Sequence, residues 1–114
     1  MEIKFDVRPK GNNITLVVLR GEIGIDTVGH FKDKLEAIVN EGKKRLIMDL
    51  QEVNYLSAMG LGVIAATLRK VKKEKGDLKF VSPSMQIQEL LDLTRMTKVF
   101  EIFDSEESAI KSFS

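Results

Sequence analysis

The chain has 114 residues, of which 43% are hydrophobic and 31% charged, a composition typical of a folded globular protein with one core. Eighteen lysine and arginine residues balance 17 aspartate and glutamate residues, so the net charge of +1 gives no electrostatic reason to expect direct binding of nucleic acid. The lack of cysteine and the single histidine, His30, exclude thiol chemistry and a metal site built from cysteine or histidine.

A hairpin is predicted at the start of the chain. Apolar and polar residues alternate over residues 3–7, which is the period of a half-buried strand. A turn at residues 11–13 leads to the apolar, β-branched segment 14–20, which predicts a more deeply buried strand that Gly21 ends.

A strand–helix–strand unit follows the hairpin. The apolar period over residues 27–40 is that of a helix, with Asp26 or Thr27 as the N-cap. The short apolar run 45–50 predicts a third strand after this helix. This order implies a right-handed crossover between two parallel strands.

A second helix is predicted to begin at or just after Ser57 and to end near Lys75. Its basic outer face is interpreted as solvated, and its inner apolar stripe is predicted to consist of Leu61, Ile64, Ala65, Leu68 and Val71. Residues 78–81 then predict a fourth strand, and Pro83 suits the first turn of a third helix. The inner face of that third helix is predicted to consist of Ile87, Leu90, Leu91 and Thr94.

The end of the chain predicts a weak edge strand within residues 99–103 and a last helix that Asp104 or Ser105 caps. The order of elements predicts an α/β protein with a small mixed β-sheet, hairpin first and parallel strands after it, and about four helices. The side chains predicted to be buried include Phe31, Leu35, Leu46, Ile47, Ile64, Leu68, Leu90 and Leu91.

The hydropathy pattern also predicts organisation and location. No apolar run approaches the length that spans a bilayer, and the first ten residues lack the apolar stretch of a secretion signal. We therefore expect a single domain over residues 1–114, in the cytoplasm and without membrane insertion.

Residues 53–64 form the most informative segment. Two glycines, Gly60 and Gly62, lie at the start of the second helix, where glycine costs roughly 1 kcal/mol relative to alanine. One interpretation is the close approach of a partner, or of an anion, to the exposed helix start. The other is that Ser57 is only an N-cap and that the glycines permit tight packing.

The pattern V-x-Y-L-S-x-x-G-L-G-V-I in this segment resembles the signature of the anti-sigma factor antagonist family, which has the STAS domain. The segments L-R-G-E-I at 19–23 and R-L-I-M-D-L at 45–50 resemble the second and third strands of that family. The resemblance continues through residues 80–83, 90–94 and 99–109, and so covers nearly the whole chain in order.

The resemblance implies a STAS-like fold and a regulatory, non-enzymatic function in bacterial transcription, without a cofactor or metal. Such domains bind a protein-serine kinase that doubles as an anti-sigma factor, and this binding frees the sigma factor. The kinase phosphorylates the antagonist at the start of the second helix and so abolishes binding, which a serine phosphatase restores. A phosphate brings about −1.5 to −2 charges into a packed interface, and the resulting desolvation and repulsion explain that loss.

This sequence departs from the family pattern D-S-[ST/A]-G-L-G. Aligning the two glycines places Ser57 at the aspartate, Ala58 at the phosphorylated serine and Met59 after it. A second acidic position of the family is Gly24 here. Ser57 is the candidate for a displaced phosphoacceptor, although a hydroxyl that caps a helix is a poor kinase substrate.

Two regulatory hypotheses follow. The first is an anti-sigma factor antagonist held in its unphosphorylated, binding-competent form. The alternative is a STAS scaffold or adaptor subunit of a sensory or lipid-transport/membrane-protein complex that is not phospho-regulated. In both, the predicted contact surface joins the loop before the first helix to the start of the second and contains Gly24, Ile25, Asp26, Thr27, Ser57, Ala58, Met59, Gly60 and Leu61.

The competing class is an enzyme. A hydrolase or transferase needs a nucleophile with a base in reach, and Ser57 has no neighbouring base in the sequence, although His30 could approach it in space. A response-regulator receiver around Asp49 needs an acidic pair after its first strand, where this chain has Arg8 and Pro9. We therefore expect no catalytic residues.

Overall fold

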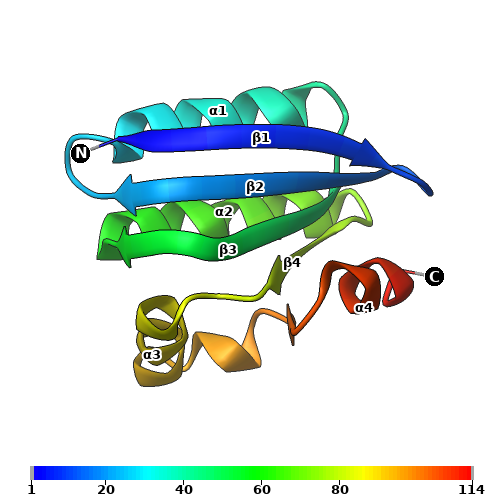
Figure 1. Ribbon diagram of the computed structural model, residues 1–114. Helices are drawn as coiled ribbons and strands as arrows, with labels where there is room; N and C mark the ends of the chain where they lie inside the picture. The colour runs from blue at the N-terminus through cyan, green and yellow to red at the C-terminus, as the bar shows by residue number, and fades with distance from the viewer. Residues whose placement is uncertain (1, 114) are drawn as a thin grey trace.

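The computed structural model describes residues 2–113 and contains one five-stranded sheet with the strand order β1-β2-β3-β4-β5 (Figure 1). β1 and β2 are antiparallel, and the other neighbouring pairs are parallel, which confirms the predicted mixed sheet. The strands are β1 (Ile3–Lys10), β2 (Ile14–Ile23), β3 (Arg45–Leu56), β4 (Asp77–Val81) and β5 (Ile102–Phe103). The helices are α1 (Val28–Asn40), α2 (Ala58–Lys73), α3 (Met85–Leu93), the 3₁₀ helix η1 (Met96–Lys98) and α4 (Glu106–Lys111).

The apolar side chains divide between the two faces of the sheet. The larger cluster joins one face to α1, α2 and α3, and the smaller cluster joins the opposite face to α4. Seven of the eight predicted core side chains are buried. Leu90 is the exception and is only partly buried, because α3 presents Ile87 and Leu91, one turn apart, to the core.

Gly21 does not end β2 as predicted, because the strand continues to Ile23. The register between β2 and β3 shifts near Gly21, whose φ of 115° lies in the region that favours glycine. A Cβ atom at this position would lie 2.2 Å from the Glu2 carbonyl oxygen. The glycine therefore permits a bulge beside β1, where the Glu22 N–H donates to the Glu2 carbonyl.

The third helix begins two residues later than predicted. Ser84 is its N-cap, so Pro83 lies outside the first turn. The Ser84 hydroxyl accepts a hydrogen bond from the Ile87 N–H at 3.4 Å and donates to the Val53 carbonyl of β3 at 2.7 Å. Thr94, predicted to face inward, is exposed because α3 ends at Leu93.

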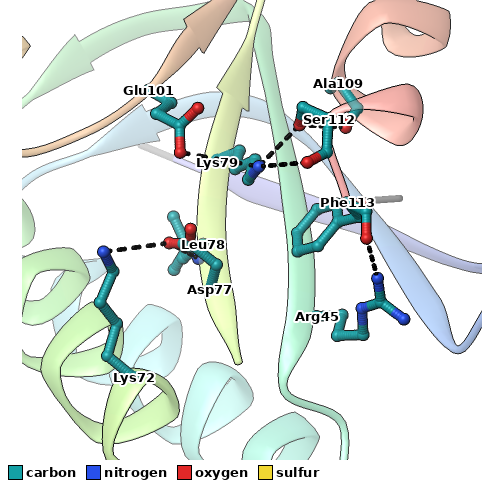
Figure 2. Close-up of polar contacts among 9 residues, drawn as sticks. All are labelled: Arg45, Lys72, Asp77, Leu78, Lys79, Glu101, Ala109, Ser112 and Phe113. Atoms are coloured by element: carbon teal, nitrogen blue, oxygen red, sulfur yellow. Dashed lines mark hydrogen bonds and ion pairs between the residues drawn. The ribbon is translucent and has the colours of Figure 1, made fainter. Parts of the chain in front are cut away.

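The last helix, α4, is held against the sheet by cations as well as by apolar side chains (Figure 2). Ser105 caps its start by accepting a hydrogen bond from the Ser108 N–H, as one of the two predicted caps. Arg45, at the start of β3, donates to the Phe113 carbonyl oxygen and to the Asn12 carbonyl oxygen. The end of α4 therefore lies beside the β1–β2 turn.

None of the helices in the described part of the chain combines the length and the apolar character that crossing a membrane requires.

Candidate functional site

The residues predicted to form the contact surface lie at one edge of the sheet. β2 and β3 end side by side, with Ile23 paired to Leu56, and α1 and α2 begin just after them (Figure 1). The Ser57 N–H donates to the Ile23 carbonyl oxygen at 2.9 Å and joins the two segments. We call residues 24–27 and 57–61 together the carboxyl edge.

The loop between β2 and α1 is fixed by one buried hydroxyl. Thr27 Oγ1 accepts a hydrogen bond from the Gly24 N–H at 2.8 Å and donates to the Glu22 carbonyl oxygen at 2.8 Å. Thr27 and Gly24 are therefore buried and shape the loop from inside. Ile25 and Asp26 are exposed, and Ile25 is 88% exposed in spite of its apolar side chain.

The start of α2 presents small and apolar groups to solvent. Ser57 is the N-cap and accepts a hydrogen bond from the Gly60 N–H at 3.1 Å. Ala58 is exposed, and Met59 is 66% exposed. Leu61, in contrast, is 6% exposed and belongs to the core, so its prediction as a surface contact is wrong.

The two glycines of α2 serve different purposes. A Cβ atom at Gly60 would lie 2.6 Å from Leu56 Cδ1 and 2.7 Å from Ile23 Cγ2, so tight packing explains this glycine. Gly62 is exposed, and a Cβ atom there would meet nothing within 4 Å. Packing within the chain therefore does not explain Gly62.

Two exposed apolar side chains near this edge were not predicted. Tyr55 is the last but one residue of β3, and Met85, 78% exposed, is the first residue of α3. The start of α3 is placed beside β3 because the Ser84 N–H donates to the Leu50 carbonyl oxygen at 3.3 Å. The sequence did offer a signal for the exposure of Met85, because it is an apolar residue at the first position of a helix.

The groups at the carboxyl edge suit docking better than catalysis. Its outward apolar side chains Ile25, Ala58 and Met59 offer neither a nucleophile nor a base, and they lie in the same surface as the exposed Asp26. His30 is exposed and packs edge-on against the Phe5 ring at a centroid distance of 5.5 Å. Among residues 2–113, no group of three or more histidine, aspartate or glutamate side chains is placed to hold a metal ion.

Comparisons with known proteins agree with this architecture. A model of the STAS domain family matches residues 7–109. The anti-sigma-B factor antagonist of Bacillus subtilis (strain 168) is 31% identical over 111 residues, which are 97% of this chain and 100% of that protein. An anti-sigma factor antagonist from Mycobacterium paratuberculosis has a crystal structure with a TM-score of 0.86, at 26% identity over 97% of this chain and 93% of that one.

The phosphorylated form of SpoIIAA, a cell fate determinant of Bacillus, has the same fold. Its structure superposes with a TM-score of 0.75 at 16% identity and covers 97% of this chain and 100% of that chain.

Proposed function

The chain belongs to the STAS domain family, and we propose that it is an antagonist that binds an anti-sigma factor through the carboxyl edge. The relative from Bacillus subtilis, which is named an antagonist of this kind, is matched over its full length. The proposal also assigns the partner a serine kinase activity and places both proteins in the cytosol. Binding would release the sigma factor that the partner holds.

The observation that carries the proposal is the apolar surface at the start of α2. Ala58 and Met59 are exposed next to each other in the first turn of α2. Ile25 is exposed on the loop between β2 and α1. Exposed apolar groups that gather in one place mark interaction sites on globular proteins. A methionine adapts its shape to a partner better than a branched side chain does.

We further propose that this antagonist is not switched off by phosphorylation at the family position. Ala58 stands at that position and has no hydroxyl. The neighbouring Ser57 hydroxyl already caps α2, so a phosphate there would have to replace the bond from the Gly60 N–H. Without an acceptor, the protein stays in its binding-competent form, and a serine phosphatase has no substrate at this position.

The binding proposal is tested with purified anti-sigma factors encoded in the same genome, by calorimetric titration. The variant Ala58→Asp introduces a charge at the centre of the proposed surface, and we expect it to abolish binding. Ala37→Asp is the matched control, because Ala37 is an exposed alanine of α1 away from this edge. Equal affinities for the two variants would show that the start of α2 is not the interface.

The phosphorylation proposal has a separate test. The protein is incubated with the bound kinase and ATP, and its intact mass is measured. We expect no added phosphate. Stoichiometric addition that disappears in Ser57→Ala would instead identify Ser57 as a displaced acceptor. If no anti-sigma factor from the genome binds, the alternative of a STAS scaffold subunit in a sensory or lipid-transport complex takes precedence.

A further inference from the structure

We propose that the groove between α1 and α2 receives an acidic amphipathic helix of the same partner protein, an inference that rests on the proposed function. The groove has a volume of about 380 Å³. Its apolar floor comes from α2 and consists of Met59, Gly62, Val63 and Ala66, and Lys32 and Lys70 lie on its α1 and α2 sides.

Gly62 is the first argument that the groove is kept open for another molecule. Glycine is less favourable than alanine inside a helix. Neither a left-handed φ nor a close neighbour requires a glycine here, because a Cβ atom would meet nothing within 4 Å. Gly60, two residues earlier, is explained by its packing against Leu56 and Ile23. The space above Gly62 is therefore free for a group from outside the chain.

Continuity with the carboxyl edge is the second argument. Met59 belongs to both surfaces, since it is exposed at the start of α2 and also lines the groove. Ala66 lies one turn beyond Gly62 and extends the apolar floor along α2. A groove between two helices offers no free strand edge for backbone pairing, so the segment that fits it is a helix with an apolar face.

Charge is the third argument and sets the chemistry of the occupant. Lys70 Nζ lies 3.5 Å from the neutral side chain of Asn40, and α2 continues past it with further basic residues. Of the residues that line the groove, one is acidic, and this Glu36 lies 3.9 Å from Lys32. The excess of positive charge favours carboxylates along the sides of the incoming helix.

The test measures stability and binding in the same variants, with the anti-sigma factor identified by the titrations above. We expect Gly62→Ala to raise the melting temperature, because alanine is the better helix former. We also expect it to weaken binding by about tenfold, because the new methyl group would crowd the bound helix of the partner. Ala66→Gln should weaken binding while its matched control Ala37→Gln, at an exposed alanine outside the groove, does not. Lys70→Glu should weaken binding more than Lys34→Glu, which lies outside the groove.

The outcomes separate this inference from the proposed function. If Ala58→Asp abolishes binding but Gly62→Ala and Ala66→Gln bind as tightly as the wild type, the groove is not occupied. The inference about the groove is then overturned, while the proposed function stands. If Lys70→Glu binds no more weakly than Lys34→Glu, the acidic character of the occupant is wrong. If no anti-sigma factor binds the wild type, the proposed function fails and this inference fails with it.

Discussion

The side-chain nitrogen of Lys79 lies 2.7 Å from Ser112 Oγ and 3.3 Å from the Ser112 carbonyl oxygen, so a cation from β4 joins the end of α4 (Figure 2). Lys79 is only 4% exposed. Its nitrogen also lies 4.3 Å from the centre of the Phe113 ring and 3.6 Å from a Glu101 carboxylate oxygen. Cations stabilise the carbonyl groups at the C-terminal end of a helix. The six-residue α4 is too short to be stable by itself, so this tertiary contact helps to hold it in place.

We predict that Lys79→Ala lowers the free energy of unfolding by about 1–3 kcal/mol, because it removes the buried donor to Ser112. Lys79→Met is the matched variant, since it keeps most of the apolar stem without the charge, and we expect it to cost less than Lys79→Ala. Urea denaturation measures both. Equal losses would mean that the stem contributes nothing.

The core position Leu68 gives the second prediction. Leu68→Ala should cost about 2–5 kcal/mol, because the side chain is buried among the residues of the larger cluster and its removal leaves a cavity. Lys73→Ala, at an exposed position of the same helix, should change the free energy of unfolding by less than about 0.5 kcal/mol. Urea denaturation measures the loss in the free energy of unfolding for both variants. Similar losses would contradict the burial of Leu68.

The two glycines of α2 predict opposite effects of one substitution. Gly60→Ala should destabilise the protein by about 1–3 kcal/mol, because the new methyl group would overlap Leu56 and Ile23. Gly62→Ala should stabilise it by up to about 1 kcal/mol, because only the helix preference changes. Melting curves of the two variants check the sign. A higher melting temperature in Gly60→Ala would refute this account of Gly60, and a lower one in Gly62→Ala would refute the account of Gly62.

The exposed pair on β1 gives a prediction for pH. The hydrogen bond from the Arg8 side chain holds the pKa of Asp6 below its ordinary value of 3.8. Because this pKa is lower in the folded state than in the unfolded state, the pair adds stability above the unfolded pKa and loses it as the pH falls through the folded pKa.

Arg8→Ala should therefore raise the pKa of Asp6 towards 3.8. Arg20→Ala is the control, since Arg20 acts on Asp6 only through its charge and should produce a smaller change. Titration of the Asp6 carboxyl carbon by NMR distinguishes them. An unchanged pKa in Arg8→Ala would show that the pair does not form in solution.

Strong periodicity in the sequence predicted the order of the elements and most of the core. The ends of β2 and β3 were not predictable in this way. Beyond Val18 the register between the two strands shifts twice, so buried side chains such as Val53 and Leu56 no longer alternate with polar ones. The start of α3 was predicted two residues too early because Ser84, which bonds to β3, is the N-cap and leaves Pro83 outside the first turn.

At the carboxyl edge, the sequence predicted which segments meet but not which side chains face outward. Thr27 is the N-cap residue of α1, as one of the two predicted caps, yet its buried hydroxyl bonds backwards into its own loop and not to the helix. Leu61 was predicted both in the inner stripe of the second helix and at the contact surface, and the structure places it in the core. Met85 lies beside β3 because the preceding Ser84 bonds to Leu50 and Val53, and no local sequence pattern records such contacts between distant segments.

The pairing of Ile3 with Gly21 brings the beginning of β1 alongside the carboxyl edge, whereas α4 ends beside the β1–β2 turn at the opposite end of the molecule (Figure 1). Any fusion tag or fluorescent reporter placed ahead of β1 would therefore stand next to the carboxyl edge and obstruct the binding proposed there. Attachment after α4 leaves that surface open, so immobilised binding assays are best anchored there.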